Sequence, residues 1–277
     1  MVVKPRILRG ALADAGLLAL GLIAAFPLLW LVCASLKDAK DLSAYLLLPW
    51  NDLGRISGHG WRAAFSGDML TWMVNSIALS GLITAGTVLV CSFAGYALAR
   101  WPGRRSRLVI GFLAGTMMLP PQVLLPASYE LMYHLGWLGT WTAIVLPSLA
   151  GAFSIILMRN AFAAVPGELY EAAAMDGAGH LRVFWQVAMP CVRPMASALT
   201  LMAFTAAWNA FLWPQVILAD VQSMPLAVGI AGMGSVQQED YAPMMAGTVL
   251  AIIPPLALFA WLQREFIAGL TQGAVKG

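Results

Sequence analysis

The stretch Val165-Pro-Gly-Glu-Leu-Tyr-Glu-Ala-Ala-Ala-Met-Asp-Gly-Ala-Gly179 is the longest polar interruption in the second half of a very apolar chain. Pro166 suits the first turn of a helix, and Glu168 and Glu171 stand where acidic side chains favour a helix N-terminus. Three alanines sustain the helix, and Gly177 can supply the left-handed residue that ends it. The stretch therefore predicts a short helix followed by a tight turn.

A second short helix is predicted directly after that turn. Leu181, Phe184 and Val187 recur at helical spacing, which indicates one apolar face. Asp176 is the unusual residue, because an acidic side chain near a helix C-terminus opposes the helix dipole. On these grounds alone, an ordinary amphipathic loop of a membrane protein explains the stretch as well as a functional motif does.

Composition places the chain in a membrane. Of its 277 residues 60% are hydrophobic and only 10% are charged, whereas soluble domains carry about 25% charged residues. The net charge of +3 is too small to suggest a nucleic-acid partner. Cys33, Cys91 and Cys191 lie in or beside apolar segments and are interpreted as small buried hydrophobes. The three histidines are scattered, so no metal site is predicted.

Six apolar segments are long enough to cross a bilayer, which takes about 20 helical residues. The predicted spans cover residues 15–36, 69–99, 108–128, 138–158, 195–219 and 243–262. The first is longer than the apolar core of a cleaved signal peptide, so it is expected to remain as a span. The third contains three prolines, at positions 120, 121 and 126. A loop is expected between the fifth and sixth spans, with Gln237, Gln238, Glu239 and Asp240 in it.

Basic residues set the expected orientation. With the N-terminus inside and six crossings, 12 of the 16 Lys and Arg residues fall in inside segments. Cytoplasmic loops carry such an excess. Both termini and the polar stretch around Glu171 are therefore expected in the cytoplasm.

The chain lacks the groups that would drive transport by itself. No phosphate-binding Gly-x-x-x-x-Gly-Lys-Ser/Thr motif is present, so ATP hydrolysis by that chemistry is excluded. No charged residue lies in the central part of a predicted span, although ion-coupled carriers usually need one. An autonomous secondary carrier or channel for a small polar solute remains the alternative, because backbone carbonyls also bind ions. No constellation of residues indicates a membrane-embedded enzyme.

The polar stretch resembles the EAA signature of ABC importer permeases. Glu171-Ala172-Ala173, Gly177 and Met189-Pro190 match that signature. Further landmarks are similar to the carbohydrate branch of the family, the smaller permease of maltose-type and glycerol-3-phosphate-type importers. They are Asn75-Ser76, residues 97–100, residues 117–120, residues 208–212 and the C-terminal run from 263 to 277.

The resemblance implies an all-α membrane protein of six transmembrane helices with the type I ABC importer permease fold. Its divisions would be residues 1–36 with the first helix, an extracytoplasmic loop 37–68, a permease core 69–264 with the cytoplasmic EAA loop 159–194, and a cytoplasmic tail 265–277. The resemblance also implies a place in the bacterial inner membrane. The implied partners are a second homologous permease, two ATPase subunits that bind ATP and Mg²⁺, an extracytoplasmic solute-binding protein and the lipid bilayer. No cofactor is implied in this chain.

The same resemblance implies the site residues. Glu171 would pair with a basic residue in a groove of the ATPase, Ala172 and Ala173 would permit close approach, and Gly177 would turn the chain between the two short helices. Asp176 and Pro190 belong to the same coupling segment. Gln122 and Asn209 are polar groups of the third and fifth spans that should face protein or water rather than lipid. Each is a candidate for the translocation pathway, with a bond to a neighbouring helix as the alternative.

Overall fold

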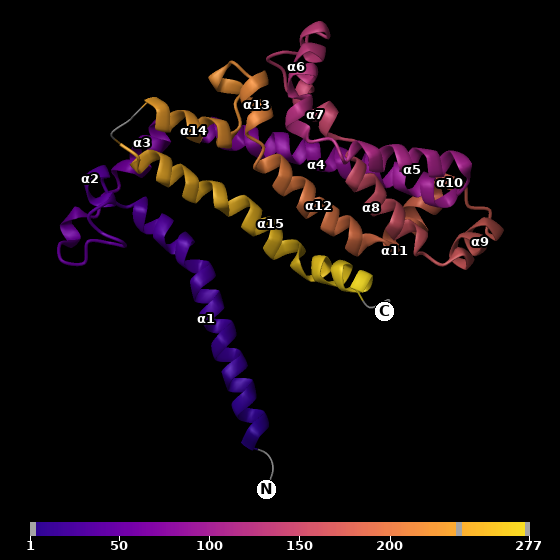
Figure 1. Cartoon of the computed structure of the whole chain (residues 1–277), viewed down its shortest axis with the longest axis horizontal. Helices are drawn as coiled ribbons and strands as arrows, with labels where there is room; N and C mark the ends of the chain where they lie inside the picture. The colour runs from indigo at the N-terminus through magenta and orange to yellow at the C-terminus, as the bar shows by residue number, and fades with distance from the viewer. Residues whose placement is uncertain (1–3, 237–239, 275–277) are drawn as a thin grey trace. The chain divides into compact units, whose positions relative to one another are not determined.

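The computed structural model describes residues 4–236 and 240–274, and every regular element among them is helical. The expected all-α class is confirmed (Figure 1). The last three residues of the predicted tail, 275–277, and the expected loop residues 237–239 lie outside the described part. The chain divides into two compact units, each of which is described by itself.

The first unit comprises residues 1–70 and 230–252. Its elements are α1 (Lys4–Ala34), α2 (Ala39–Leu42), the 3-10 turn η1 (Leu53–Arg55) and α3 (His59–Ser66), together with the adjoining ends of longer helices. Gly60 lies against the backbone of Ala242, where a Cβ atom would come within 2.5 Å of the carbonyl oxygen. The close approach explains why a glycine stands there.

A buried cation organises the loop after α1. The Lys37 side chain is almost inaccessible to solvent, and its ammonium group donates a hydrogen bond to the Tyr45 carbonyl at 2.8 Å. Burial lowers the pKa of Lys37, against an opposing effect of the nearby acid Asp41. Asp41 is itself buried and forms an ion pair of 2.8 Å with Arg55.

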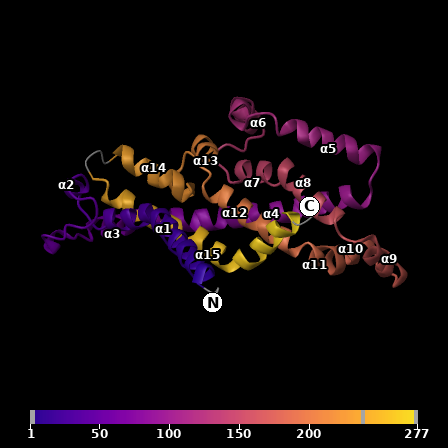
Figure 2. The same ribbon diagram turned by 60° about the horizontal axis from the view of Figure 1, so that its bottom comes forward.

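The second unit comprises residues 71–229 and 253–277. Most of α4 (Met69–Arg100) belongs to it. The following elements are α5 (Arg104–Thr116), η2 (Pro121–Leu124), α6 (Leu125–His134), α7 (Thr142–Ser148), α8 (Ala152–Ala163), α9 (Gly167–Met175), α10 (His180–Val183), the π turn η3 (Phe184–Ala188), α11 (Met189–Cys191), α12 (Arg193–Trp208), α13 (Leu212–Ile217), η4 (Val221–Ser223), most of α14 (Leu226–Val236) and the second half of α15 (Ala242–Ala274). Helix α8 lies between α5 and α12 in both views and contacts each of them (Figures 1 and 2).

Among the described residues, four helical segments have the length and composition of a membrane span, and the number rises to six if two bent helix pairs each count as one. The four are residues 14–34, 69–100, 142–163 and 242–265. The first, second and last agree with the predicted spans. The fourth predicted span, 138–158, is displaced, because its helix begins at Thr142 and continues past Arg159 to Ala163.

The third predicted span, 108–128, is wrong as one continuous crossing. Helix α5 ends at Thr116, and the pair formed with residues 121–134 is bent by 89°. Pro120 and Pro121 favour the break, because proline lacks an amide hydrogen and disfavours the helical conformation of the residue before it. Pro126 lies instead in the first turn of α6, where no intrahelical donor is needed.

The fifth predicted span, 195–219, is also interrupted. Helix α12 ends at Trp208, and α13 starts only at Leu212. The expected loop before the last span contains an unpredicted helix, α14, whose 11 residues are too few to cross a bilayer. Asn75 donates hydrogen bonds to the carbonyls of Gln222 and Met224, at 2.7 and 2.9 Å, and so secures the chain that leads into α14.

Polar side chains satisfy the backbone groups that a membrane helix break exposes. Pro147 has no amide hydrogen for the carbonyl of Ala143, and the Trp213 indole donates to that carbonyl at 3.0 Å. At the break between α7 and α8, the Thr87 hydroxyl donates to the Ser148 carbonyl at 3.2 Å. Such substitutes are required because lipid offers no hydrogen bonds.

The cysteine interpretation holds for two of three residues. Cys33 and Cys91 are buried, as expected for small hydrophobes, but Cys191 is exposed. Its exposure follows from its place at the end of α11, directly before the chain turns into α12.

Candidate functional site

The polar stretch forms an elbow between α8 and α12, defined here as residues 166–191. Its first arm is α9, and its second arm is the continuous run of α10, η3 and α11. The two predicted short helices are therefore confirmed. Pro166 does not lie within the first turn as expected, because it is the N-cap and the helix begins at Gly167.

Gly177 turns the chain at the end of α9, as predicted. Its φ angle is +73°, in the left-handed region that favours glycine. The Ala178 amide donates to the Ala173 carbonyl and the Gly177 amide to the Ala174 carbonyl, both at 3.0 Å. This pair of bonds is the Schellman motif, which satisfies two carbonyls that the helix end leaves free.

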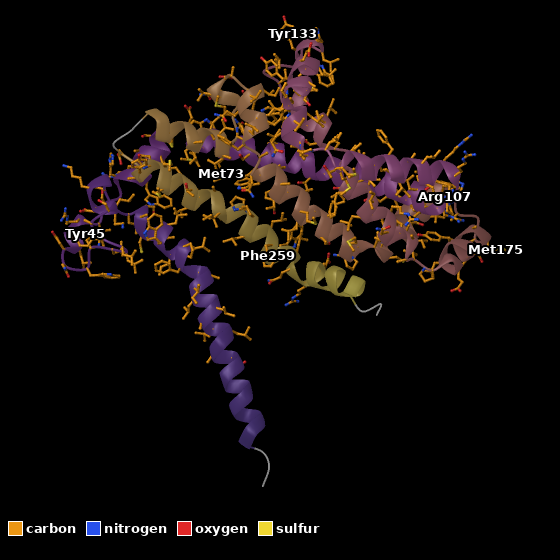
Figure 3. The ribbon with its side chains drawn as sticks, in the orientation of Figure 1. Tyr45, Met73, Arg107, Tyr133, Met175 and Phe259 are labelled. Atoms are coloured by element: carbon orange, nitrogen blue, oxygen red, sulfur yellow. The ribbon has the colours of Figure 1, made fainter. Side chains whose placement is uncertain are left out.

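The outer face of α9 is open to solvent. Glu168, Glu171, Ala172 and Asp176 are exposed, and none of these three acids has an ion-pair partner among the side chains that the structure describes, in residues 14–38, 40–233 and 240–265. Met175 is 88% exposed and lies on α9 at the edge of the second unit (Figure 3). Acidic and apolar side chains on one exposed helix face are suited to a protein surface that is basic at one point and apolar at another.

The inner face of α9 rests on an aromatic cluster. Tyr170 is buried, and its ring centroid lies 6.2 Å from that of Tyr96 on α4. Tyr96 also contacts Phe162 of α8 at 5.5 Å and Phe184 of η3 at 5.2 Å. The guanidinium carbon of Arg100 stands 5.4 Å from the Tyr170 centroid, which is within cation–π range. One ring on α4 thus connects both arms of the elbow to α8.

Burial has an electrostatic consequence at Tyr170. Desolvation raises the pKa of its phenol, and Arg100 opposes that rise. The phenol therefore stays neutral at physiological pH. Its ring packs in the cluster and makes the cation–π contact with Arg100.

Beside this cluster, α4 and α8 meet without intervening side chains. A Cβ atom on Gly95 would lie 2.7 Å from the backbone nitrogen of Arg159 and 2.8 Å from the Cβ of Met158. The two backbones therefore touch next to Tyr96. Because neither helix can approach further, the pair offers a stiff support for the elbow.

The second arm changes its helical pitch before Pro190. The Met189 amide donates to the Phe184 carbonyl, five residues back, so that residues 184–188 form a π turn. Pro190 has no amide hydrogen for the carbonyl four residues earlier, which accounts for a disturbed helix at this point. Phe184 and Ala188 are buried while Leu181 is 68% exposed, so the predicted apolar face begins at Phe184 rather than at Leu181.

Sequence reasoning missed the residues beneath the elbow. Tyr96 and Phe162 were not singled out, and Arg100 was noted only as the last residue of the landmark 97–100; Tyr96 and Arg100 are far from Tyr170 in the sequence. The available signal was local: Tyr170 and Ala173 are three residues apart and share one face of a helix whose other face is acidic.

Gln122 lies beside a large cavity of the second unit, whereas Asn209 does not line it. The cavity has a volume of about 990 Å³. It lies among η2, α6, α7, α12 and α13, and its polar lining residues are Gln122, Ser128 and Ser148. Asn209 is exposed in the break after α12, next to the lining residue Ala210. The structure therefore brings one of the two pathway candidates to the cavity and places the other at its edge.

Comparisons with known proteins cover nearly the whole chain. A family model described as "Binding-protein-dependent transport system inner membrane component" matches residues 88–271. The arabinooligosaccharides transport system permease protein of Halalkalibacterium halodurans is 31% identical over 257 residues, which are 92% of each chain. The sn-glycerol-3-phosphate transport system permease protein of Yersinia pestis is 33% identical over 261 residues, 90% of this chain and 91% of that one.

The fold also has a counterpart among solved structures. A chain of a bacterial ABC transporter involved in the import of the acidic polysaccharide alginate superposes with a TM-score of 0.79 and 23% identity. The match covers 96% of this chain and 99% of that chain. At this identity the likeness concerns the fold.

Proposed function

Since this chain belongs to the family of binding-protein-dependent transport system inner membrane components, we propose that it forms part of the solute pathway of an ATP-driven importer for a sugar or a polyol phosphate. It is a multi-pass protein of the inner membrane and a permease component rather than an enzyme. Similarity to permeases at 31–33% identity over at least nine-tenths of the chain carries the proposal.

The solute class rests on the relatives. One is named for arabinooligosaccharides and another for sn-glycerol 3-phosphate. Both solutes are rich in hydroxyl groups, so a sugar oligomer and a polyol phosphate are the two classes to test. An extracytoplasmic solute-binding protein would deliver the solute, and a second homologous permease would complete the pathway.

Coupling to ATP is assigned to the elbow. Its outer face, with Glu171, Ala172 and Asp176 exposed, is available to a cytoplasmic ATPase that would bind ATP and Mg²⁺. Ala173 is half-buried against the aromatic cluster, so its small side chain serves the packing of α9 on the membrane helices. Gly177 and Pro190 shape the two arms. In this proposal residues 69–264 form the permease core of five membrane helices, and its loop 159–194 and the tail 265–277 lie in the cytoplasm.

The solute pathway is assigned to the cavity beside Gln122. The side-chain amide can donate and accept hydrogen bonds, which suits a hydroxyl-rich solute. Asn209, at the edge of the cavity, can do the same. Apolar residues form most of the wall, so affinity at this site would be low and release of the solute easy.

The decisive experiment reverses one charge on the elbow. We expect Glu171→Lys to weaken co-purification of the ATPase at least about tenfold, because it opposes a basic groove. Uptake of labelled sn-glycerol 3-phosphate or arabinose oligosaccharide into vesicles should fall in parallel. Glu130→Lys is the matched control, since Glu130 is an exposed acid on α6. Normal ATPase binding by Glu171→Lys would refute the coupling assignment.

The alternative function, an autonomous carrier or channel, makes the opposite prediction. Vesicles that contain this chain alone would then take up the labelled solute without ATP. The importer proposal expects no uptake until the second permease, the ATPase and the solute-binding protein are supplied.

A further inference from the structure

One carboxylate fastens α15 to the start of α12. In Glu265, Oε1 lies 2.8 Å from a terminal guanidinium nitrogen of Arg193, and Oε2 accepts a hydrogen bond from the Ser197 hydroxyl at 2.5 Å. Arg193 and Ser197 are one turn apart on α12 and therefore face the same side. Both oxygens of Glu265 are engaged from different directions, which fixes the carboxylate. We call Arg193, Ser197 and Glu265 the clasp.

The two contacts of the clasp differ in exposure. The Arg193 side chain is 73% exposed, so its ion pair is screened by water and salt. Ser197 is buried, and the hydrogen bond from its hydroxyl to the Glu265 carboxylate is charge-assisted, which places it in the stronger class of hydrogen bonds. The serine contact therefore holds the carboxylate, and the arginine compensates its charge.

The clasp stands directly after the elbow. Arg193 is the first residue of α12, two positions beyond the last residue of α11. The chain bends by 82° between the second arm of the elbow and α12. A displacement of the second arm of the elbow is transmitted along the chain to α12 through this bend, next to the core packing that the two already share.

Packing next to the clasp is loose. Thr200 and Phe204 of α12 and Leu258 of α15 line a cavity of about 360 Å³, together with residues of α4 and of the elbow. Leu258 lies two helical turns before Glu265, so the cavity adjoins the clasp along both helices. With a hollow beside it, the contact between these parts of α12 and α15 depends on the clasp more than on side-chain packing.

We infer that Glu265 is a positioning residue whose carboxylate makes the second half of α15 follow the start of α12 when the elbow moves. The inference rests on the proposed function, because ATP-driven movement of the elbow supplies the displacement. Movement of the elbow would then reach the membrane helices by two routes. The aromatic cluster transmits it to α4 and α8, and the clasp transmits it to α15.

A spin-label distance tests the clasp in the assembled transporter. Cysteines replace Met175 on α9 and Trp261 on α15, which are 88% and 79% exposed, in a variant without the three natural cysteines. The chain is assembled in nanodiscs with its second permease and ATPase. Pulsed electron paramagnetic resonance then measures the distance distribution without nucleotide and with ATP and vanadate.

The clasp predicts one narrow distribution in the parent protein, displaced as a whole by ATP and vanadate. Glu265→Ala should widen the nucleotide-free distribution about twofold, because the charge-assisted contacts that hold α15 are lost. Arg264→Ala is the matched control, since it removes an exposed charge from the adjacent position and leaves the clasp intact. An unchanged width in Glu265→Ala overturns the inference.

Charge reversal separates the clasp from a general loss of structure. Arg193→Glu and Glu265→Arg should each widen the distribution, and the double variant should restore the parent width. The Ser197 hydroxyl can donate or accept, so it suits either arrangement. A double variant that stays wide while its thermal unfolding matches the parent also overturns the inference. A parent distribution that does not respond to ATP and vanadate would count against the proposed function instead.

Discussion

Gly177→Ala is the most direct test of the elbow, because this substitution adds one methyl group without a clash. A Cβ atom at Gly177 meets nothing within 4 Å, so the only penalty comes from the backbone conformation. At φ +73° an L-residue is strained by roughly 1–2 kcal/mol. The same substitution also removes glycine's freedom in the unfolded chain, which stabilises a protein by about 0.4–1 kcal/mol.

Gly167→Ala isolates the strain. Gly167 is the first residue of the same helix, a Cβ atom there also meets nothing within 4 Å, and its backbone is helical. Both variants gain the unfolded-chain term, so it cancels in their difference. The remaining difference is the left-handed strain of about 1–2 kcal/mol, which corresponds to roughly 5- to 30-fold in the equilibrium for opening the turn.

Hydrogen exchange measures this opening without any partner protein. In nanodiscs, the peptide that contains the Gly177 and Ala178 amides should exchange roughly 5- to 30-fold faster in Gly177→Ala than in Gly167→Ala. Gly177→Asn should fall between them, because asparagine tolerates the left-handed region. Equal exchange in the two alanine variants would refute the reasoning, since the turn would then not require its positive φ.

Substitutions at Tyr170, Gly95 and Lys37, two of them with a matched control, test the supports of the two units. Tyr170→Ala should lower the free energy of unfolding by about 3–5 kcal/mol in thermal or denaturant unfolding, as for other buried aromatic rings, whereas Tyr170→Phe keeps the ring and should stay close to the parent. Gly95→Ala should cost about 1–3 kcal/mol in the same assay, because its Cβ atom would meet the Arg159 backbone nitrogen at 2.7 Å; Gly81→Ala, on the same helix with open space, should cost nothing. Burial holds the pKa of Lys37 below its usual value of 10.5, so the unfolded chain binds more protons between the two values and stability should rise with pH across that interval. Lys37→Met should abolish the rise, and a rise that persists in this variant would assign it to another group.

Local signals predicted the elbow well. The acids after Pro166, the alanines and Gly177 all act within a few residues of one another, and helix ends are decided at that range. Gly177 accordingly adopts the predicted left-handed conformation. The membrane class was equally predictable, because the scarcity of charge is a property of composition.

The interruptions of the membrane helices were harder to predict. Pro120 and Pro121 are visible in the sequence, but the 89° bend depends on what surrounds the freed backbone. Helix α14 was not predicted, because its 11 described residues are too few for a span and show no strong helical period. A length criterion finds helices that cross the bilayer without a break. The broken helices and α14 are shorter, and neighbouring helices pack against them.

Contacts between distant residues could not be predicted from spacing. Tyr96 and Tyr170 belong to separate helices, and nothing in either local sequence specifies the other as its partner. The partners of Glu265 could not be predicted either, since its local sequence indicates only a charged residue at the end of a span. Its partners on α12 become evident only when the helices are placed in space.

The arrangement of these contacts explains why α9 has two dissimilar faces. An exposed acidic face alone could bind a partner without moving the membrane helices. A buried aromatic face alone would contact the membrane helices but could not bind a partner that moves them. In α9, Glu171 lies on the outer face and the adjacent Tyr170 lies on the inner face, so a force applied to one residue reaches the other through the backbone that they share. From Tyr170 the force passes to Tyr96, and the backbone contact at Gly95 prevents α4 from moving independently of α8.

Tyr170→Ala should therefore leave binding of the ATPase intact while uptake falls, whereas Glu171→Lys should abolish both. Loss of ATPase binding in Tyr170→Ala at normal folding would show that the two faces do not act in series.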